Sequence, residues 1–209
     1  EGRIIYGLGA IKGLGEGPVE NIIAARTEGG PFKDLFDFCA RVDGRKVNKR
    51  ALEAMIRSGA LDQIGPDGEM GYRRAVMLAG MDEAVKLAEQ HARNTSSGMG
   101  DLFGNSVVDS AVDINYNSYS GARSLSIKER LNGERDTLGL YLTGHPIDEY
   151  EDELRRMHPN RISALRPGKE SATVSGMVVA MRVMKNKRGE NFAFLTLDDK
   201  SGRLEVSVF

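Results

Sequence analysis

The sequence predicts an α+β protein, mostly helical and ending in an antiparallel sheet. Apolar residues recur with helical spacing through much of the chain, and from Ala172 onward the period changes to two. Between these parts, residues 94–124 are rich in Ser, Asn and Gly and show little periodicity. We therefore expect a helical domain over residues 1–93, a flexible linker over 94–125, a helical connector over 126–170 and barrel strands over 171–209.

Capping signals bound the expected helices. Pro18 suits a first helical turn, because its missing N–H is not needed there. Asn48 is a favourable N-cap and Gly59 a favourable C′ residue. Ser126 and Glu129 match a capping box. The expected helices cover residues 18–26, 34–42, 49–58, roughly 72–92, and a segment from 126 that Gly144 ends, with Pro146 starting another.

The last part of the chain predicts three strands, over residues 172–185, 192–197 and 203–209. The connections "NKRGEN" and "DDKSG" suit hairpin turns. Three strands cannot close a barrel, so we expect a truncated one. Phe192 and Phe194 share a strand face, where they either stack on bases or fill the barrel core. For alternating Phe on a strand we favour the core.

Composition and charge limit the classes of function. The chain is 40% hydrophobic and 28% charged, as in soluble globular proteins. The single Cys39 cannot form an internal disulfide, and there is neither a signal peptide nor an apolar run of membrane-spanning length. We therefore expect a cytoplasmic protein. Because the chain begins at Glu1 and stops within a strand, we expect it to be part of a longer protein.

The charge is unevenly distributed along the chain. The net charge is −1, yet residues 1–60 carry ten basic and eight acidic side chains, and residues 160–209 carry nine and five. The middle of the chain is correspondingly acidic. The two ends are therefore the better candidates for contact with phosphate, although such small imbalances also occur on ordinary solvated surfaces.

The segment "IKGLGEGPVENII" places three glycines in front of a helix. Glycines there let backbone N–H groups approach an anion, and the helix N-terminus adds unsatisfied donors and partial positive charge. A P-loop requires Lys and Ser or Thr after the last Gly, where this chain has Pro18 and Val19. The glycine spacing also differs from the dinucleotide fingerprint. What remains is a helix–hairpin–helix that binds nucleic-acid backbone, or a tight turn without a ligand.

Metal and catalytic sites are not expected. The three histidines share no ligand spacing with each other or with a Cys, and we expect His145, between Gly144 and Pro146, to be structural. The acidic pairs Asp198–Asp199 and Glu151–Asp152 lack a convergent third carboxylate for two-metal phosphoryl transfer. We expect the first pair in a hairpin turn and the second on an exposed helix face, both in surface roles.

Six sequence blocks, taken in order, resemble one family. They are "YGLGAIKGLGEG", "GPFKDLFDFC", "NKRALEAMIRSGALD", "DLFG", "ERDTLGLYLTGHP" and "FLTLDDKSGRLEV". The chain resembles the C-terminal part of the bacterial replicative DNA polymerase III alpha subunit over essentially its whole length. The resemblance implies a tandem helix-hairpin-helix domain, a sliding-clamp-binding peptide and an oligonucleotide-binding (OB) barrel. It also implies that the polymerase carboxylates and their Mg²⁺ lie upstream, so this chain would have no catalytic residues and no cofactor.

Carried over to this sequence, the resemblance implies contacts with the duplex backbone from the first hairpin, with Glu16 lowering the affinity and Lys12 partly compensating. The second hairpin is degenerate and is either a DNA contact or structural. The first barrel turn supplies three cations for single-stranded DNA. The implied DNA-binding residues are Lys12, Gly13, Leu14, Gly15, Gly17, Ser58, Gly59, Lys185, Lys187 and Arg188.

The segment "GMGDLFG" resembles the family's clamp-binding peptide, with Met99 at the position usually held by Gln, followed by Asp101, Leu102 and Phe103. An apolar pair in a polar segment is a liability unless a pocket receives it. The alternative is that the pair folds back onto the helical domain. Other replicase subunits are implied as partners of the whole protein.

Two other classes of protein remain open. One is a fragment of a DNA repair nuclease or ligase that uses the same hairpin module. Such enzymes have no reason to share the "DLFG" segment followed by the "GHP" helix break. The other is an interaction scaffold without DNA contact, which salt-dependent duplex binding distinguishes from the first hypothesis.

Overall fold

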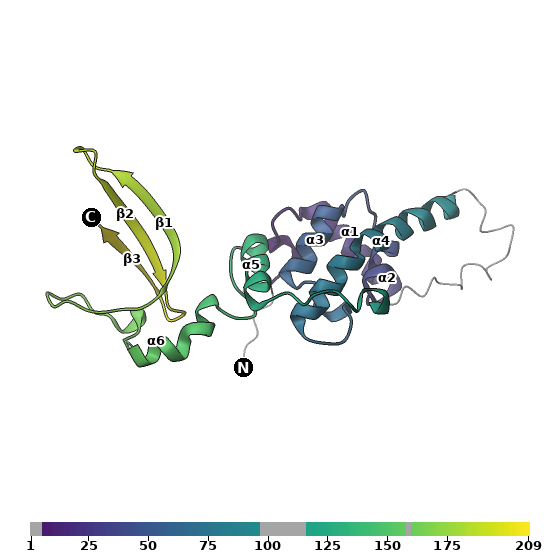
Figure 1. The fold of residues 1–209 in the computed structure, drawn as a ribbon. Helices are drawn as coiled ribbons and strands as arrows, with labels where there is room; N and C mark the ends of the chain where they lie inside the picture. Colours follow the sequence, from purple (N-terminus) through teal and green to yellow (C-terminus); the bar gives the residue numbers. More distant parts are fainter. Residues whose placement is uncertain (1–5, 97–115, 158–159) are drawn as a thin grey trace. The chain divides into compact units, whose positions relative to one another are not determined.

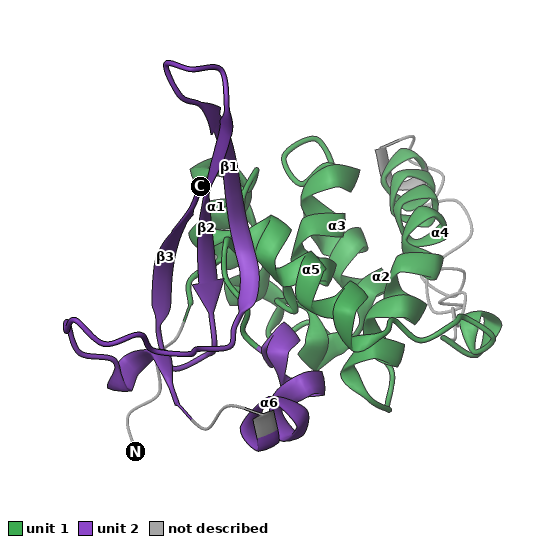
Figure 2. Cartoon of the chain, turned by 60° about the vertical axis from the view of Figure 1, so that its left-hand side comes forward, with its two compact units in different colours: residues 1–142 green, residues 143–209 purple. Residues whose placement is uncertain are grey.

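The computed structural model describes residues 6–96, 116–157 and 160–209. These residues form two compact units, 1–142 and 143–209 (Figures 1 and 2). Unit 1 is helical and unit 2 contains a three-stranded antiparallel sheet, which confirms the α+β prediction. The division falls inside the segment expected to be a connector, so its helices are shared between the units. Within the described residues, no helix is both long and apolar enough to cross a membrane.

Local capping explains most of the helix boundaries in unit 1. The Asn48 side chain accepts a hydrogen bond from the Ala51 N–H, and Gly59 ends that helix in the left-handed conformation. Both bonds of the capping box between Ser126 and Glu129 are present. The elements are η1 (Leu8–Ala10), α1 (Glu16–Gly29), α2 (Leu35–Arg41), α3 (Lys49–Ser58), η2 (Asp62–Ile64), α4 (Met70–Ser96), η5 (Tyr116–Tyr119) and α5 (Ile127–Leu138).

Several boundaries differ from those expected; α1, for example, covers Glu16–Gly29 and not 18–26. Helix α5 ends at Leu138, not at Gly144, because Gly139 adopts the left-handed conformation with φ of 81°. The Gly139 N–H then bonds the Arg135 carbonyl at 2.8 Å. Pro146 does start the next helical turn, as expected. Both Gly139 and Gly144 could end this helix, and Gly139 does so because it adopts the left-handed conformation of a C-cap.

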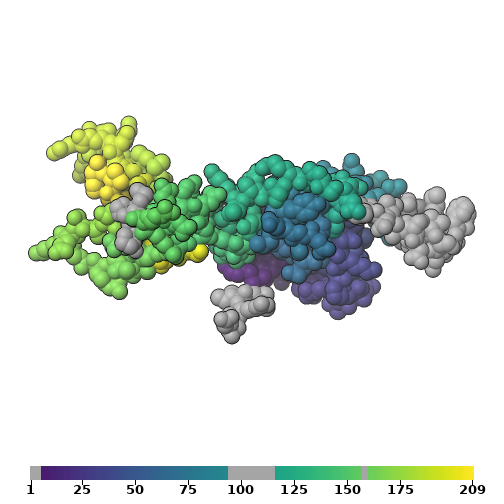
Figure 3. All heavy atoms as spheres, turned by 60° about the horizontal axis from the view of Figure 1, so that its bottom comes forward, coloured from purple at the N-terminus to yellow at the C-terminus, as the bar shows by residue number. Residues whose placement is uncertain are grey.

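The core of unit 1 lies between α4 and the shorter helices. Helix α4 packs against α2 and α3, and α5 packs against α3 (Figure 1). In the space-filling view the purple, blue and teal atoms of this unit lie against one another (Figure 3). The large apolar side chains most deeply buried in this core are Leu35, Phe38, Leu52, Met55, Ile56 and Met77.

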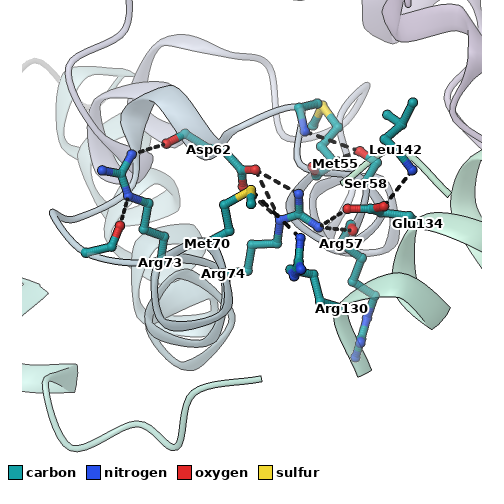
Figure 4. Close-up of polar contacts among 12 residues, drawn as sticks. Met55, Arg57, Ser58, Asp62, Met70, Arg73, Arg74, Arg130, Glu134 and Leu142 are labelled. Carbon is teal, nitrogen blue, oxygen red and sulfur yellow. Dashed lines mark hydrogen bonds and ion pairs between the residues drawn. The ribbon is translucent and has the colours of Figure 1, made fainter. Parts of the chain in front are cut away.

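A buried ion network joins α3, α4 and α5 (Figure 4). The Arg74 side chain is 1% exposed and donates to Asp62 at 2.8 Å and to Glu134 at 2.9 Å. It also donates to the Arg57 carbonyl. Glu134 is 0% exposed and accepts a second bond, from the Leu142 N–H at 2.8 Å. Burial lowers the pKa of Arg74, but the hydrogen bonds and charges of Asp62 and Glu134 outweigh it, so this pKa is raised and the guanidinium stays charged.

Tyr116 and Tyr119, which follow residues 97–115, attach their segment to the helices of unit 1. The Tyr116 hydroxyl donates to the Ile64 carbonyl at 2.8 Å and accepts from the Leu35 N–H at 2.9 Å. The Tyr119 hydroxyl bonds Glu83 of α4, and its ring lies against Gly80. Both flanks of residues 97–115 therefore belong to the same unit.

Unit 2 consists of a sheet with short helical turns before it. Strand β2 lies in the centre and pairs antiparallel with β1 and with β3. A register shift between Val178 and Ala180 marks an irregularity near the start of β1. The elements are η6 (Pro146–Tyr150), α6 (Glu151–Met157), η7 (Ile162–Ala164), β1 (Met177–Lys185), β2 (Asn191–Asp198) and β3 (Arg203–Val208).

Removing Arg74 should strongly destabilise the chain. Arg74→Met leaves the Glu134 carboxylate buried without its partner, which costs about 3–5 kcal/mol of unfolding free energy. Adding Glu134→Leu should recover part of this loss, because the uncompensated charge disappears. Urea denaturation measures both effects. As a control, Arg93→Met removes an exposed pair with Glu89 on the same helix and should cost about 0.5 kcal/mol or less. A double variant no more stable than Arg74→Met would contradict this account.

Candidate nucleic-acid interface

The first hairpin is a tight turn between η1 and α1. Ile11 and Leu14 are each 4% exposed and anchor the turn in the core of unit 1. The Leu14 N–H donates to the Ile11 carbonyl at 3.0 Å. Leu14 is therefore engaged inside the protein through both its side chain and its N–H. The exposed part of the hairpin is made by Lys12, Glu16 and the glycines.

Only one of the three hairpin glycines is required by the backbone. Gly13 has φ of 84°, which favours glycine. Gly15 has φ of −77° and ψ of 180°, an extended conformation that any residue adopts. Among the described residues, no atom lies within 4 Å of where a Cβ atom at Gly15 or Gly17 would be. Packing among the described residues therefore does not account for these two glycines, which leaves their backbone open to a ligand.

The start of α1 supplies hydrogen-bond donors to this open surface. The N-cap is Gly15, so no side chain caps the helix. The N–H groups of Glu16 and Gly17 in its first turn therefore have no partner within the helix. These donors and the positive end of the helix dipole favour an anion. The Glu16 carboxylate opposes this at short range, and Lys12 is exposed close by in the sequence.

Helix α5 holds the hairpin from the inside. The Lys12 N–H donates to the Thr137 carbonyl at 2.8 Å. Thr137 is buried, and its hydroxyl donates to the Gly133 carbonyl at 2.6 Å. The same helix carries Glu134 of the buried ion network. Sequence analysis missed this support, since it connects opposite ends of unit 1.

The second hairpin is engaged within the protein. Ser58 is 5% exposed, and its hydroxyl donates to the Met55 carbonyl at 2.9 Å. A Cβ atom at Gly59 would lie 2.2 Å from an Arg74 nitrogen and 2.8 Å from an Asp62 oxygen. Close packing against the ion network therefore accounts for this glycine without a ligand. DNA contact by Ser58 and Gly59 stays a prediction.

The basic residues expected in the first barrel turn lie on the exposed β1–β2 connection. Lys185 ends β1, and Lys187 and Arg188 follow in the turn. The Asn186 side chain accepts from the backbone N–H groups of Arg188 and Glu190, which holds the turn closed. Three cations therefore extend from one short, internally bonded loop.

The two faces of the sheet differ in chemistry. Residues paired across strands share a face, and the register groups the aromatic side chains with polar ones. The Arg182 guanidinium lies 5.2 Å from the Phe194 ring centroid, and Phe192 contacts Phe194 at 5.6 Å. The mixed face also holds Thr196, Glu205 and Ser207, while the apolar face holds Val178, Met181, Val183, Ala193, Leu195, Leu197, Leu204, Val206 and Val208.

This arrangement differs from the expected core-filling role of the two phenylalanines. Strand alternation places Phe192 and Phe194, both half-buried, on the face opposite the apolar one, which the polar pair Lys185–Asn191 ends. The apolar face itself is open within the described structure, with Met181 67% and Val183 56% exposed. The aromatic rings are therefore on the face that carries polar groups.

The acidic pair of the β2–β3 turn is buried, which corrects the surface role expected for it. Asp198 and Asp199 are 7% and 3% exposed. Asp199 accepts from the N–H groups of Ile162, Ser201 and Gly202. Burial alone raises the pKa of the Asp199 carboxyl, but these hydrogen bonds outweigh it and hold the pKa below its ordinary value.

Asp198 is equally committed to structural contacts. It accepts from the Lys200 N–H and from Arg203 at 2.8 Å, and the His145 Nε2 atom lies 3.2 Å from its carboxylate. The His145 Nδ1 atom accepts from the Ile147 N–H, so this histidine caps η6. In residues 6–96, 116–157 and 160–209 there is no group of three or more His, Cys, Asp or Glu side chains that could hold a metal ion.

The implied clamp-binding residues Met99, Asp101, Leu102 and Phe103 lie outside the described residues. Their predicted role therefore rests on the sequence. What the structure describes are the two flanks, Ser96 at the end of α4 and Tyr116 at the start of η5.

The hairpin and its supporting helices define the class of the N-terminal part. A family model described as a helix-hairpin-helix motif matches residues 1–69, which contain both hairpins. This match supports DNA binding by unit 1.

Relatives match the whole chain. It is 58% identical to the DNA polymerase III subunit alpha of Pseudomonas fluorescens, 50% identical to that of Vibrio cholerae and 46% identical to that of Escherichia coli K12, each across 100% of this chain. The resemblance to the DNA polymerase III alpha subunit is therefore confirmed. The chain spans about 18% of the length of these curated relatives.

The Asp199 network predicts acid sensitivity in unit 2. Folding lowers the pKa of the Asp199 carboxyl. The network therefore stabilises unit 2 fully above the pKa of an unfolded Asp, about 3.9. This stabilisation is lost as the pH falls through the lower pKa of the folded state. Unit 2 should therefore lose stability below about pH 4. The Asp199→Asn variant should have a lower free energy of unfolding at pH 7 than the unchanged chain. It should also lose less of that free energy on acidification. Urea unfolding followed by NMR of the β2 and β3 amides measures this.

Asp152→Asn, on an exposed face of α6 in the same unit, serves as the control for the Asp199 experiment. It should leave the pH profile of unit 2 almost unchanged. An identical profile for Asp199→Asn and the unchanged chain would show that these hydrogen bonds contribute nothing.

Proposed function

We propose that this chain is a DNA-binding and sliding-clamp-binding part of a replicative DNA polymerase III alpha subunit. The observation that carries the proposal is the open backbone at Gly15 and Gly17, where no packing contact of the described residues requires glycine. Their N–H groups and those of the α1 start would bond phosphate oxygens of duplex DNA. Such contacts fix the position of the protein on the duplex without reading its sequence.

Unit 2 would hold single-stranded DNA as part of an OB-type barrel. The open apolar face of its sheet is what the interior of a barrel presents before further strands cover it. The opposite face offers Phe192 and Phe194 as stacking surfaces, and the β1–β2 turn adds Lys185, Lys187 and Arg188. Aromatic stacking combined with backbone cations is the usual mode of binding single strands.

The segment containing Asp101, Leu102 and Phe103 would insert its apolar pair into a pocket of the sliding clamp. Its two flanks are fixed to unit 1 by α4 and by the Tyr116 hydrogen bonds. A peptide attached at both ends to the DNA-binding unit would hold the clamp close to the duplex.

The whole protein would add deoxynucleotides to a primer 3′ end in the bacterial cytoplasm, with Mg²⁺ at carboxylates outside this chain, and would assemble with other replicase subunits. This activity is that of a DNA polymerase, as the curated relatives are named. We assign no catalytic step to residues of this chain. A repair nuclease or ligase is disfavoured, because the similarity to the alpha subunit extends over the whole chain.

Blocking the hairpin backbone should weaken duplex binding. Gly15→Val places a branched side chain where phosphate would approach, while the extended backbone accepts valine. Losing one hydrogen bond to a charged group costs about 1.5–3 kcal/mol, so affinity should fall roughly ten-fold or more for every duplex sequence. Fluorescence anisotropy with labelled duplexes measures the change.

Gly7→Val is a matched control for the hairpin experiment. Gly7 also lies in front of a helical turn, with φ of −73° and open space around its Cβ position. This variant should bind duplex like the unchanged chain. Unaltered affinity in a correctly folded Gly15→Val chain would refute the hairpin assignment.

The clamp proposal predicts a separate effect. Full burial of each of Leu102 and Phe103 is worth about 1.5–3 kcal/mol, so replacing both with Ala should weaken clamp binding by about a hundred-fold or more. Met99→Gln should strengthen binding several-fold, since it provides an amide able to hydrogen-bond. Calorimetric titration with a bacterial sliding clamp measures both. If the pair instead packs on unit 1, the Ala variant will lower the melting temperature without a loss of clamp binding.

A further inference from the structure

A group of four cationic side chains lies at the start of α3, outside both hairpins. It consists of Arg45, Lys46, Lys49 and Arg50, here called the α3 patch, and all four are exposed. The buried Val47, 8% exposed, anchors the segment in the core of unit 1. The backbone is therefore fixed, and the cationic side chains project from it into solvent.

The α3 patch is only partly neutralised. Arg45 pairs with Asp43 at 3.1 Å, and Lys49 pairs with Asp82. Within the described part of the chain, the side chains of Lys46 and Arg50 form no ion pair. The patch therefore carries an excess of two positive charges on the surface of unit 1.

The placement of these charges is unfavourable for the isolated protein. Lys49 and Arg50 occupy the first turn of α3, which contains no acidic residue. A helix N-terminus carries partial positive charge and favours acidic side chains. By contrast, α2 has Asp37 in its first turn and α5 has Glu129. Local rules of this kind are most often broken at functional sites, where a ligand supplies the missing charge.

The segment that leads into the α3 patch is attached to α1. The Asn21 side chain of α1 accepts a hydrogen bond from the Asp43 N–H at 2.8 Å, which holds the start of the basic segment against α1. Asn21 follows Gly17 by four positions, so the two share a helix face and are separated by about 6 Å along the axis. The contact of Asp43 with α1 therefore lies about one helical turn from Gly17, and the patch residues follow Asp43 in the sequence.

Duplex DNA matches this spacing. Each strand presents one phosphate per about 3.4 Å of helix axis. A backbone that touches the N–H groups of Gly15 and Gly17 would therefore bring further phosphates within reach of long side chains one turn away. Lys46 and Arg50, neither of which forms an ion pair within the described residues, would complement the charge of such a strand.

We propose that the α3 patch is a second contact with the phosphate backbone of the duplex that the first hairpin binds, made chiefly by Lys46 and Arg50. This inference rests on the proposed DNA-binding function and extends its surface. The hairpin contributes backbone donors, and the patch contributes charge that is independent of hairpin geometry. Together they form one continuous sequence-independent surface.

The test is the salt dependence of duplex binding by the 209-residue chain. The double variant Lys46→Gln and Arg50→Gln removes two phosphate contacts, so the slope of log affinity against log salt should become shallower by about 1.8. The ratio of the affinity of the unchanged chain to that of the variant should therefore be about ten-fold smaller at about 200 mM salt than at about 50 mM salt. The matched control, Lys33→Gln with Lys128→Gln, removes two exposed charges of unit 1 elsewhere and should leave the slope unchanged.

The outcomes separate this inference from the function on which it rests. If Gly15→Val weakens binding while the patch variant keeps the original slope, the patch is refuted and the hairpin assignment stands. An equal slope change in the control also refutes the patch, because the effect is then one of net charge alone. If the unchanged chain shows no salt-dependent duplex binding, both proposals fail. Melting curves confirm that each variant is folded, as expected for exposed side chains.

Discussion

The Arg74 guanidinium is the point on which the helical unit depends. A charge that is 1% exposed is tolerated only when oppositely charged groups and hydrogen bonds surround it. Asp62 from the second hairpin and Glu134 from α5 meet this requirement. Apolar contacts between helices permit some sliding, whereas a bidentate guanidinium fixes both direction and distance. The network therefore determines how α3, α4 and α5 are arranged.

Helix α5 connects the ion network to the first hairpin, the candidate DNA-binding surface. Glu134 holds this helix against α4, and the Thr137 carbonyl of the next turn fixes the Lys12 backbone. A hairpin that is already held in its binding conformation loses less entropy when phosphate arrives. Ile11 and Leu14 also anchor the loop in the core. The loop is therefore held in place although its glycines have no side chains.

Much of this fold was predictable, because its signals are local. The caps at Asn48, Gly59 and Ser126 involve partners within a few residues, and the strands follow from simple alternation. The end of α5 was misjudged because several nearby glycines could have ended it. The ion network was missed because its partners are up to 60 positions apart. A signal did exist, since Arg74 falls on the apolar stripe of α4 formed by Met77, Met81 and Ala84.

The hydrogen bond between Lys12 and Thr137 also has a consequence for the order of folding. These residues lie at opposite ends of unit 1, and closing so long a loop costs chain entropy that only late tertiary contacts offset. On the ribosome the glycine hairpin emerges first, yet its supporting helix is among the last parts of the unit to be synthesised. The hairpin, although synthesised early, is therefore one of the last segments of the unit to reach its native conformation.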